Sequence, residues 1–240
     1  MPKKSHPDSH LVSFTAPASF AAEQYQGLRL TLERLARTRD AKVFAVTSPA
    51  AGDGKTVTAI NLAGALARGS ESRVLLIDAD LRRPTVARQL DIEADKGLAD
   101  ALGGDGEVDA LILKVEPFEN LFVLPAGSPH TGVHQILRSP RLEAFMIQAR
   151  QRFDYIVIDT PPLLPVFDSA MLAKWVDGVL MVVAANQTPR KLLGEALNLL
   201  DPEKVLGIVF NRDERPLFGY YDAYYREYFP ADASRVASEA

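Results

Sequence analysis

A glycine-containing segment, Ser48 to Thr56, has the residue types that bind phosphate. It reads Ser-Pro-Ala-Ala-Gly-Asp-Gly-Lys-Thr and lies between an apolar run and a helix-like stretch that begins near Lys55. Gly52 and Gly54 allow backbone N–H groups to approach phosphate oxygens, and the positive end of the helix attracts the same anion. Lys55 would reach the β- and γ-phosphates of ATP, and the Thr56 hydroxyl would bind Mg²⁺. The predicted nucleotide-binding residues of this segment are Gly52, Asp53, Gly54, Lys55, Thr56 and Val57.

The start of the segment departs from the general phosphate-loop pattern. That pattern places a glycine six residues before the lysine, and here the position holds Pro49. The alternative is a glycine-rich turn between a strand and a helix that contains Gly-Lys-Thr by chance. Acidic residues further along the chain favour the phosphate loop, because such a loop needs carboxylates to hold a metal ion and organise the attack.

Carboxylates follow two apolar runs at the point where each run ends. Asp78 and Asp80 follow the run 74–77, and Asp159 follows the run 155–158. Side chains alternate along a strand, so Asp78 and Asp80 are expected to project to the same side. Ligands of open parallel sheets gather at the carboxyl ends of strands, which is where all three acids lie. The sequence therefore predicts a metal-assisted phosphoryl-transfer site.

The elements that would position these residues are strand-length apolar runs separated by helix-like segments. The runs lie at 42–47, 74–77, 121–124, 155–158, 178–184 and 206–210, and the clearest helical segments at 21–38, 55–68, 141–152 and 190–200. Non-alternating apolar strands joined by helices indicate a parallel sheet that is covered on both faces. The predicted fold class is α/β, a doubly wound and mainly parallel sheet of the P-loop NTPase kind.

Length and composition set the remaining bounds. The 240 residues suit one large α/β domain, expected at 21–212 between a flexible arm at 1–20 and a tail at 213–240. A net charge of −4 argues against nucleic-acid binding, and the absence of cysteine excludes disulfides and thiolate chemistry. No run approaches the ~18 apolar residues of a membrane span, and the polar N-terminus does not resemble a signal peptide. We expect a cytoplasmic protein that reaches the inner face of the plasma membrane through a partner.

Five motifs in this order resemble one family. They are Gly-Lys-Thr at 54–56, Asp-Ala-Asp-Leu-Arg-Arg-Pro at 78–84, Lys-Gly-Leu-Ala-Asp at 96–100, Leu-Pro-Ala-Gly at 124–127 and Asp-Thr-Pro-Pro at 159–162. From about residue 21 to the tail, the chain resembles the bacterial tyrosine kinases (BY-kinases) of capsule and exopolysaccharide operons. Those kinases are relatives of MinD and ParA among the P-loop proteins.

The resemblance implies a role for each matching residue. Lys55 and Thr56 would bind phosphate and metal, Asp80 and Asp159 would organise Mg²⁺, and Asp78 would accept the tyrosine proton. Asn211 and Arg212, after the last strand, look like the segment that contacts adenine. The implied catalytic residues are Lys55, Asp78, Asp80 and Asp159, the metal ligands Thr56, Asp80 and Asp159, and the further nucleotide contacts Arg82, Asn211 and Arg212.

Two positions differ from related patterns. ParA and MinD relatives carry a signature lysine five positions before the phosphate-loop lysine, where this chain has Ala50. That difference favours the kinase branch over the partitioning ATPases. The family's Glu-x-x-Arg-x-x-Arg pattern occurs as Glu23, Gln26 and Arg29, without its middle arginine. These residues belong either to a ring-forming contact or to a solvated helix face.

The tail holds a tyrosine cluster: Tyr220, Tyr221, Tyr224, Tyr225 and Tyr228. Four-residue spacing would place these tyrosines on one helix stripe, but in a phosphoryl-transfer protein they are also natural acceptors. Nine residues separate Asn211 from Tyr220, about 30 Å when extended. We expect transfer in trans within a homo-oligomer, which phosphate charge would then loosen.

The leading interpretation is an ATP- and Mg²⁺-dependent tyrosine autokinase that regulates exopolysaccharide or capsule polymerisation and export. Its expected partners are a separate membrane adaptor of the polysaccharide chain-length-determinant type and an opposing protein-tyrosine phosphatase. The alternatives are a ParA/MinD-like ATPase switch and a non-catalytic ATP-binding scaffold. His130 and His134 have helical spacing but no acidic or thiol partner nearby in the sequence, so no zinc site is predicted. Trp175, in an apolar stretch, is expected in the core.

Overall fold

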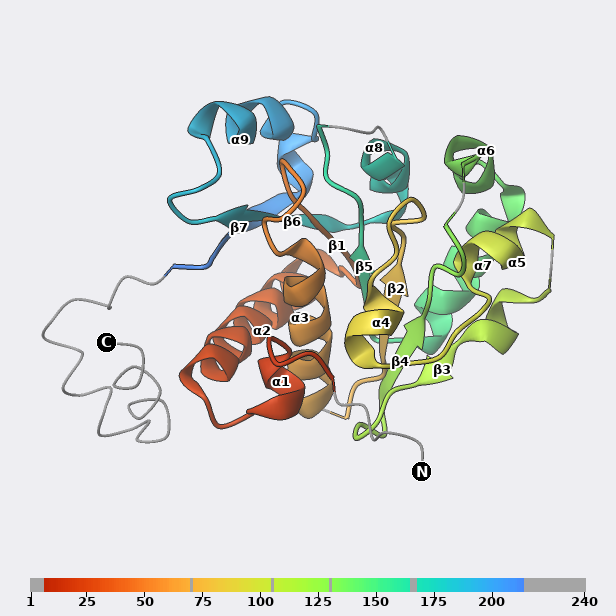
Figure 1. The fold of residues 1–240 in the computed structure, drawn as a ribbon, viewed down its shortest axis with the longest axis horizontal. Coiled ribbons are helices and arrows are strands. Elements are labelled where there is room, and N and C mark those ends of the chain that lie inside the picture. Colours follow the sequence, from red (N-terminus) through yellow and green to blue (C-terminus); the bar gives the residue numbers. More distant parts are fainter. Residues whose placement is uncertain (1–6, 70, 105, 130, 165–167, 214–240) are drawn as a thin grey trace, which may run out of the picture.

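A computed structural model describes residues 7–69, 71–104, 106–129, 131–164 and 168–213, which form a seven-stranded sheet with helices on both faces (Figure 1). The strand order is β3-β4-β2-β5-β1-β6-β7, and all neighbours are parallel except the antiparallel pair β3 and β4. The strands are β1 (Val43–Thr47), β2 (Val74–Asp78), β3 (Leu113–Lys114), β4 (Leu121–Leu124), β5 (Tyr155–Asp159), β6 (Gly178–Ala184) and β7 (Val205–Asn211). The predicted doubly wound, mainly parallel sheet is confirmed.

The helices join successive strands across this sheet. The α-helices are α1 (Val12–Thr15), α2 (Phe20–Arg39), α3 (Lys55–Gly69), α4 (Val86–Leu90), α5 (Leu98–Gly103), α6 (Val133–Leu137), α7 (Pro140–Arg152), α8 (Asp168–Leu172) and α9 (Arg190–Leu197). Short 3₁₀ turns are η1 (Val108–Leu111), η2 (Ala173–Trp175) and η3 (Pro202–Lys204). The long helices begin and end for ordinary reasons: the Ser19 hydroxyl accepts a hydrogen bond from the Ala22 N–H at the start of α2, and left-handed Asp40 ends it.

The core consists of two apolar layers, one on each face of the sheet. Alternate residues of a strand enter opposite layers, so Phe44 packs on the side of α1, α2 and α3, whereas Ala45 packs on the side of α5, α7 and α8. Strands β1, β2 and β6 are buried throughout, which is why they read as unbroken apolar runs in the sequence. This rigid sheet fixes the positions of the loops at its carboxyl edge.

The segment before α2 is packed where a flexible arm was predicted. Leu11 is fully buried in the layer that contains α3, and α1 follows it. The Ser13 N–H donates to Asn61 Oδ1 (2.9 Å), the Ser13 hydroxyl donates to the Asn61 carbonyl (2.9 Å), and Asn61 Nδ2 donates to the His10 carbonyl (2.9 Å). The prediction of a loose arm over 1–20 is therefore wrong for residues 8–16. Residues 1–6 lie outside the described residues.

The other predicted boundary falls at the end of β7. The five clustered tyrosines, 220–228, lie outside the described residues, so the tail assigned to 213–240 stays a prediction. Across the residues that the structure describes, no helix combines the length and the apolarity needed to cross a membrane.

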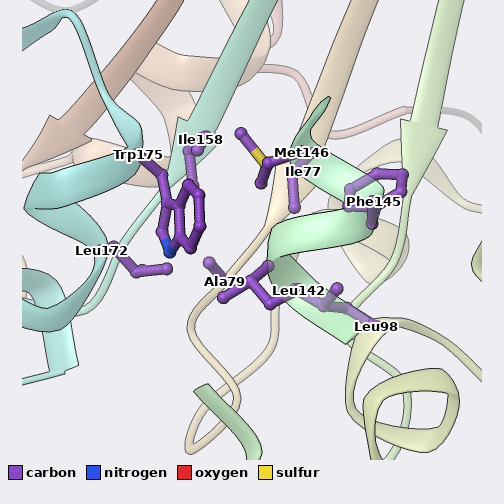
Figure 2. A pocket seen from close by; sticks show the side chains of 9 residues that line it. All are labelled: Ile77, Ala79, Leu98, Leu142, Phe145, Met146, Ile158, Leu172 and Trp175. Carbon is purple, nitrogen blue, oxygen red and sulfur yellow. The ribbon is translucent and has the colours of Figure 1, made fainter. Parts of the chain in front are cut away.

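Trp175 lies in η2 against the layer formed by α5, α7 and α8, as predicted for a core residue, although it is only partly buried. Its ring, together with Ile77, Ile158 and Met146, lines a small apolar cavity of about 10 Å³ (Figure 2). Lys174 Nζ lies 4.3 Å from the centre of the indole ring. A space of this size holds about one water molecule at most, so we assign the cavity no ligand.

Candidate active site

The predicted phosphate loop joins the carboxyl end of β1 to the first turn of α3. Its conformation depends on two glycines, since Gly52 (φ 94°) and Gly54 (φ 93°) both lie in the region that side chains disfavour. A Cβ atom on Gly54 would lie 1.9 Å from Asn211 Nδ2, so this position also needs glycine for space. The N–H groups of the first turn of α3 have no partners within the helix and are available to an anion.

Side chains from two distant strands hold this loop in place. Asp53 Oδ2 accepts a hydrogen bond from the Ala50 N–H (3.2 Å), and Asp53 Oδ1 accepts one from the Thr188 hydroxyl (2.7 Å) beyond β6. Asn211, the last residue of β7, donates from Nδ2 to the Asp53 carbonyl (3.0 Å). The Asp53 side chain therefore stabilises the loop and is not free to contact a nucleotide, which leaves its backbone for that role.

Lys55, Thr56, Asp80 and Asp159 come together at the start of α3. Lys55 Nζ lies 3.1 Å from Asp80 Oδ2 and 3.5 Å from Asp159 Oδ1. The Thr56 hydroxyl donates to Asp159 Oδ2 at 2.7 Å. Register explains the meeting, because β2 and β5 are paired with Asp78 opposite Asp159, and β1 lies next to β5. The structure thus brings together four of the residues predicted from the sequence.

Burial and mutual charge determine the ionisation of this group. Burial alone lowers the pKa of Lys55, but the charges of Asp159 and Asp80 outweigh burial and raise the pKa above its ordinary value. Burial raises the pKa of Asp159, although the Lys55 charge and the Thr56 hydroxyl oppose the increase. A lysine that stays protonated suits phosphate binding, and a carboxylate that is costly to bury suits a site that takes up a cation.

Asp78 is the third carboxylate of the site. Its oxygens accept hydrogen bonds from backbone N–H groups, whereas Asp80 Oδ2 contacts Lys55. Asp78 Oδ2 accepts hydrogen bonds from the N–H groups of Thr85 (3.1 Å) and Val86 (3.0 Å), which begin α4, and its Oδ1 accepts one from the Asp80 N–H (3.1 Å). Burial and the nearby charge of Asp159 raise the pKa of Asp78 to about 7. Asp78 therefore joins the end of β2 to the start of α4.

Arg82 binds Asp168 in the structure, and its predicted contact with nucleotide stays a prediction. Arg82 Nε and Nη2 donate to the two oxygens of Asp168 at 2.6 and 3.2 Å. His134 Nε2 lies 3.0 Å from Asp168 Oδ1, an acidic contact that comes from a segment distant in the sequence. Asp168 itself is only 1% exposed. This cluster ties the loop after β2 to α6 and α8.

Asn211 and Arg212 lie beside the phosphate loop at the end of β7. Asn211 binds the loop itself, and Arg212, which is exposed with a positive φ of 57°, donates to Gln187 Oε1 at 3.2 Å. Their contact with adenine stays a prediction.

In α2, Arg29 donates to Gln26 (2.9 Å) and to Glu33 (2.8 Å), whereas Glu23 is exposed. Arg29 thus makes contacts within its own helix and does not belong to a wholly solvated face.

The donor set fits a magnesium ion bound together with nucleotide phosphates. Thr56, Asp80 and Asp159 offer hydroxyl and carboxylate oxygens, the hard ligands that Mg²⁺ takes in phosphoryl-transfer sites. In the part of the chain that the structure describes, no group of three or more His, Cys, Asp or Glu residues has the geometry to hold a metal.

Sequence reasoning did not identify Asp168, Thr188 or Thr85 as site residues. Thr188 follows β6 at the carboxyl edge of the sheet, so its place after an apolar run was a usable signal. Asp168 has no such signal, because it is 86 residues away from its partner Arg82 in the chain.

Comparisons with known proteins agree with this geometry. A family profile described as an AAA domain matches residues 41–200. ExoP of Rhizobium meliloti (strain 1021), named a succinoglycan biosynthesis transport protein, is 35% identical over 86% of this chain, which spans only 27% of ExoP. YwqD of Bacillus subtilis (strain 168), named a tyrosine-protein kinase, is 30% identical over 88% of this chain and 91% of YwqD.

Solved structures show the same relationship. The crystal structure of the chimerical protein CapA2B2 superposes with a TM-score of 0.81 at 26% identity, covering 88% of this chain and 92% of that one. The cell division ATPase MinD of Pyrococcus furiosus gives 0.61 at 26% identity over 74% of each chain. Fold and site together define a P-loop NTPase of the MinD/ParA-like kind. Within that class, the chain belongs to the AAA-domain family and to its bacterial tyrosine kinases, the BY-kinases.

Proposed function

We propose that this chain is an ATP- and Mg²⁺-dependent autokinase that phosphorylates tyrosines of its C-terminal tail in trans. The observation that carries the proposal is the buried group at the start of α3, where Lys55 meets Asp80 and Asp159 and Thr56 binds Asp159. These residues combine a fixed cation, a metal-binding oxygen set and a helix N-terminus, which is the equipment for phosphoryl transfer.

The proposed step transfers the γ-phosphoryl group of ATP to a tyrosine hydroxyl. The new bond forms between the phenolic oxygen and the γ-phosphorus, the bond from that phosphorus to the bridging oxygen breaks, and ADP leaves with the bond's electron pair. The phenolic proton passes to Asp78, whose raised pKa of about 7 suits a group that accepts a proton near neutral pH. Mg²⁺, when bound, neutralises charge on the β- and γ-phosphates. Lys55 holds the transferred group, and the backbone of residues 52–56 orients it.

Strand order supports transfer between chains. Four strand spacings, about 19 Å, separate β7 from β2 along the sheet. Reach alone does not prevent a tail from returning to its own site, since about 30 Å of extended chain lies between Asn211 and Tyr220. The direct path from β7 to Asp78, however, passes β1 and its phosphate loop, where the nucleotide would lie. A neighbouring chain can present its tail without crossing its own nucleotide.

The relatives suggest where this activity is used. ExoP is named a biosynthesis transport protein for succinoglycan, and YwqD is named a tyrosine-protein kinase. On that basis we propose a role in regulating exopolysaccharide or capsule polymerisation and export, in the cytoplasm at the inner face of the plasma membrane. There the chain would form homo-oligomers and contact a separate membrane adaptor of the chain-length-determinant type. A protein-tyrosine phosphatase would remove the phosphate groups from its tail.

The test separates the enzyme copy from the acceptor copy. The enzyme copy is the full chain with its five tail tyrosines changed to phenylalanine, and the acceptor copy carries Lys55→Met with its tail intact. With Mg-ATP, the mixture should produce phosphotyrosine in the tail of the acceptor, whereas the acceptor alone should produce none. The matched control carries Lys191→Met in place of Lys55→Met, because Lys191 is exposed on α9, and this copy should still phosphorylate itself.

Each other result has a definite meaning. If the wild-type chain becomes phosphorylated but the mixture does not, transfer occurs within one chain. If ATP is hydrolysed and no phosphotyrosine forms, the protein is an ATPase switch of the MinD kind. If nucleotide binds without turnover, the protein is a scaffold. Phosphotyrosine that persists without Mg²⁺ would contradict the assigned metal-binding role of Thr56, Asp80 and Asp159.

A further inference from the structure

A second hollow borders Asp78, with a volume of about 250 Å³. Its lining residues come from α4, from the segment after α4 and from the segment after β4: Asp78, Pro84, Ala87, Arg88, Ile92, Ala94, Pro125, Ala126 and Gly127. Among the described residues this lining includes none of the phosphate loop, 48–56. Asp78, which lies opposite Asp159 across the sheet, therefore stands between the group at the start of α3 and this hollow.

We propose that this hollow, the acceptor pocket, receives the ring of a tail tyrosine from a second copy of the chain, and that Arg88 selects tyrosines followed by an acidic residue. The inference rests on the proposed kinase function and adds to it the acceptor subsite and its preference. Its volume is below the roughly 300–1,000 Å³ of pockets that hold whole small molecules, which suits a single aromatic side chain.

The chemistry of the walls fits a phenol. Pro84, Ala87, Ile92 and Pro125 offer apolar surface to a ring. Asp78 is the acidic group of the lining, and three hydrogen bonds from backbone N–H groups occupy only part of its capacity. A carboxylate has about four acceptor positions, so Oδ1, which receives one bond, can accept a second from a phenolic hydroxyl.

Arg88 gives the pocket a positive rim. It is exposed in the middle of α4, and no ion pair involves it within the described ranges. Acidic residues occur nearby at Asp91, Glu93 and Asp95, but they alternate with Ile92 and Ala94, and only those two line the pocket. Within the lining, Arg88 is the cation, and it remains available to an anion that enters beside the ring.

The tail contains a matched pair that tests this preference. Tyr221 and Tyr225 are each the second residue of a Tyr-Tyr pair, but Asp222 follows the first and Arg226 follows the second. We therefore expect Tyr221 to be phosphorylated faster than Tyr225. The contact with Arg88 is solvent-exposed, and such ion pairs change equilibria or rates by about two- to five-fold.

The experiment uses the separated copies described above, and mass spectrometry measures the initial rates at Tyr221 and Tyr225 of the acceptor. Arg88→Gln in the enzyme copy should reduce the ratio of the two rates by about two- to five-fold, and Arg88→Glu should invert it. An acceptor that carries both Asp222→Arg and Arg226→Asp should reverse the site preference of an enzyme copy that keeps Arg88. Tyr225, which then precedes the acidic residue, should be phosphorylated faster than Tyr221. The matched control is Arg83→Gln, because Arg83 is an exposed arginine in the loop before α4 that does not line the pocket.

A second variant tests the pocket itself. Ala94→Trp places a large ring in the hollow, so tail phosphorylation should fall at least ten-fold while ADP binding and the melting temperature remain as in the wild type. A site ratio that does not respond to Arg88 or to the charge swap overturns the preference. If a folded Ala94→Trp chain still phosphorylates tails at the wild-type rate, the assignment of the acceptor pocket is wrong. The assignment is also wrong if Ala94→Trp removes only the increase in rate that an adaptor segment causes and leaves the basal rate unchanged. A wild-type chain that forms no phosphotyrosine contradicts the proposed function instead.

Discussion

Removing either side of the pair between Arg82 and Asp168 should destabilise the protein by unequal amounts. Arg82→Met leaves the Asp168 carboxylate, which is 1% exposed, with the His134 ring as its remaining side-chain contact. Removing one partner from a buried pair costs about 3–5 kcal/mol, and the surviving histidine contact places this case near 3 kcal/mol. Asp168→Asn leaves Arg82, which is 36% exposed and can turn toward water. The cost is then close to that of lost charged hydrogen bonds, about 1.5 kcal/mol.

Equilibrium unfolding in urea measures both values by linear extrapolation. The chain's one tryptophan, Trp175, reports on the same half of the molecule as α6 and α8. Lys191→Met is the control, because the pair of Lys191 and Glu195 is exposed and 4.0 Å apart, and its loss should cost less than about 0.5 kcal/mol. Equal losses for the two test variants, or a larger loss for Asp168→Asn, would refute the reasoning from burial.

Three further changes address other parts of the structure. Gly54→Ala should weaken ADP binding and lower stability by about 1–3 kcal/mol, since its Cβ meets Asn211 at a positive φ; Gly103→Ala, with open space around it, is the control in titration and thermal unfolding. Although burial raises the pKa of Asp177, bonds from Arg150 and two backbone N–H groups lower it overall. Asp177→Asn should therefore cost about 1.5–3 kcal/mol at neutral pH, a difference that disappears as pH falls through the lowered pKa; a constant difference down to strongly acid pH would contradict this assignment. Leu11→Ala should cost about 2–5 kcal/mol in urea unfolding, whereas a loose arm would give a value near zero.

Much of the fold was predictable because its central strands are buried on both faces. Such strands are apolar along nearly their whole length, and β1, β2, β5 and β6 could be located for that reason. The site was partly predictable for a related reason, since carboxylates directly after such strands have to lie at one edge of the sheet. Lys55, Asp80 and Asp159 met as expected.

The remaining features depend on contacts that leave no local pattern. The apolar residues from Leu11 to Phe14 form too short a run to predict an element, and they do not reveal that Asn61 of α3 fixes the segment around them. The contact of Arg82 with nucleotide stays a prediction, and its bond to Asp168, a carboxylate far along the chain, had no signal in the sequence. β2 ends at Asp78, so Asp80 lies beyond the strand and does not alternate with Asp78 along it as expected, and the two N–H groups at the start of α4 donate to Asp78 Oδ2. In each case tertiary hydrogen bonding decided the outcome.

The contact between Asn211 and the phosphate loop has a mechanical consequence. β7 is an edge strand that pairs with β6 alone among the described strands, and its last residue is held by the Ala185 N–H at 2.8 Å and by the bond from Asn211 to the Asp53 carbonyl. A force that draws the following chain away from the domain loads these bonds before any others in β7. Tension on the tail, such as that exerted by a neighbour that grips it, is therefore transmitted first to the backbone that surrounds the phosphates.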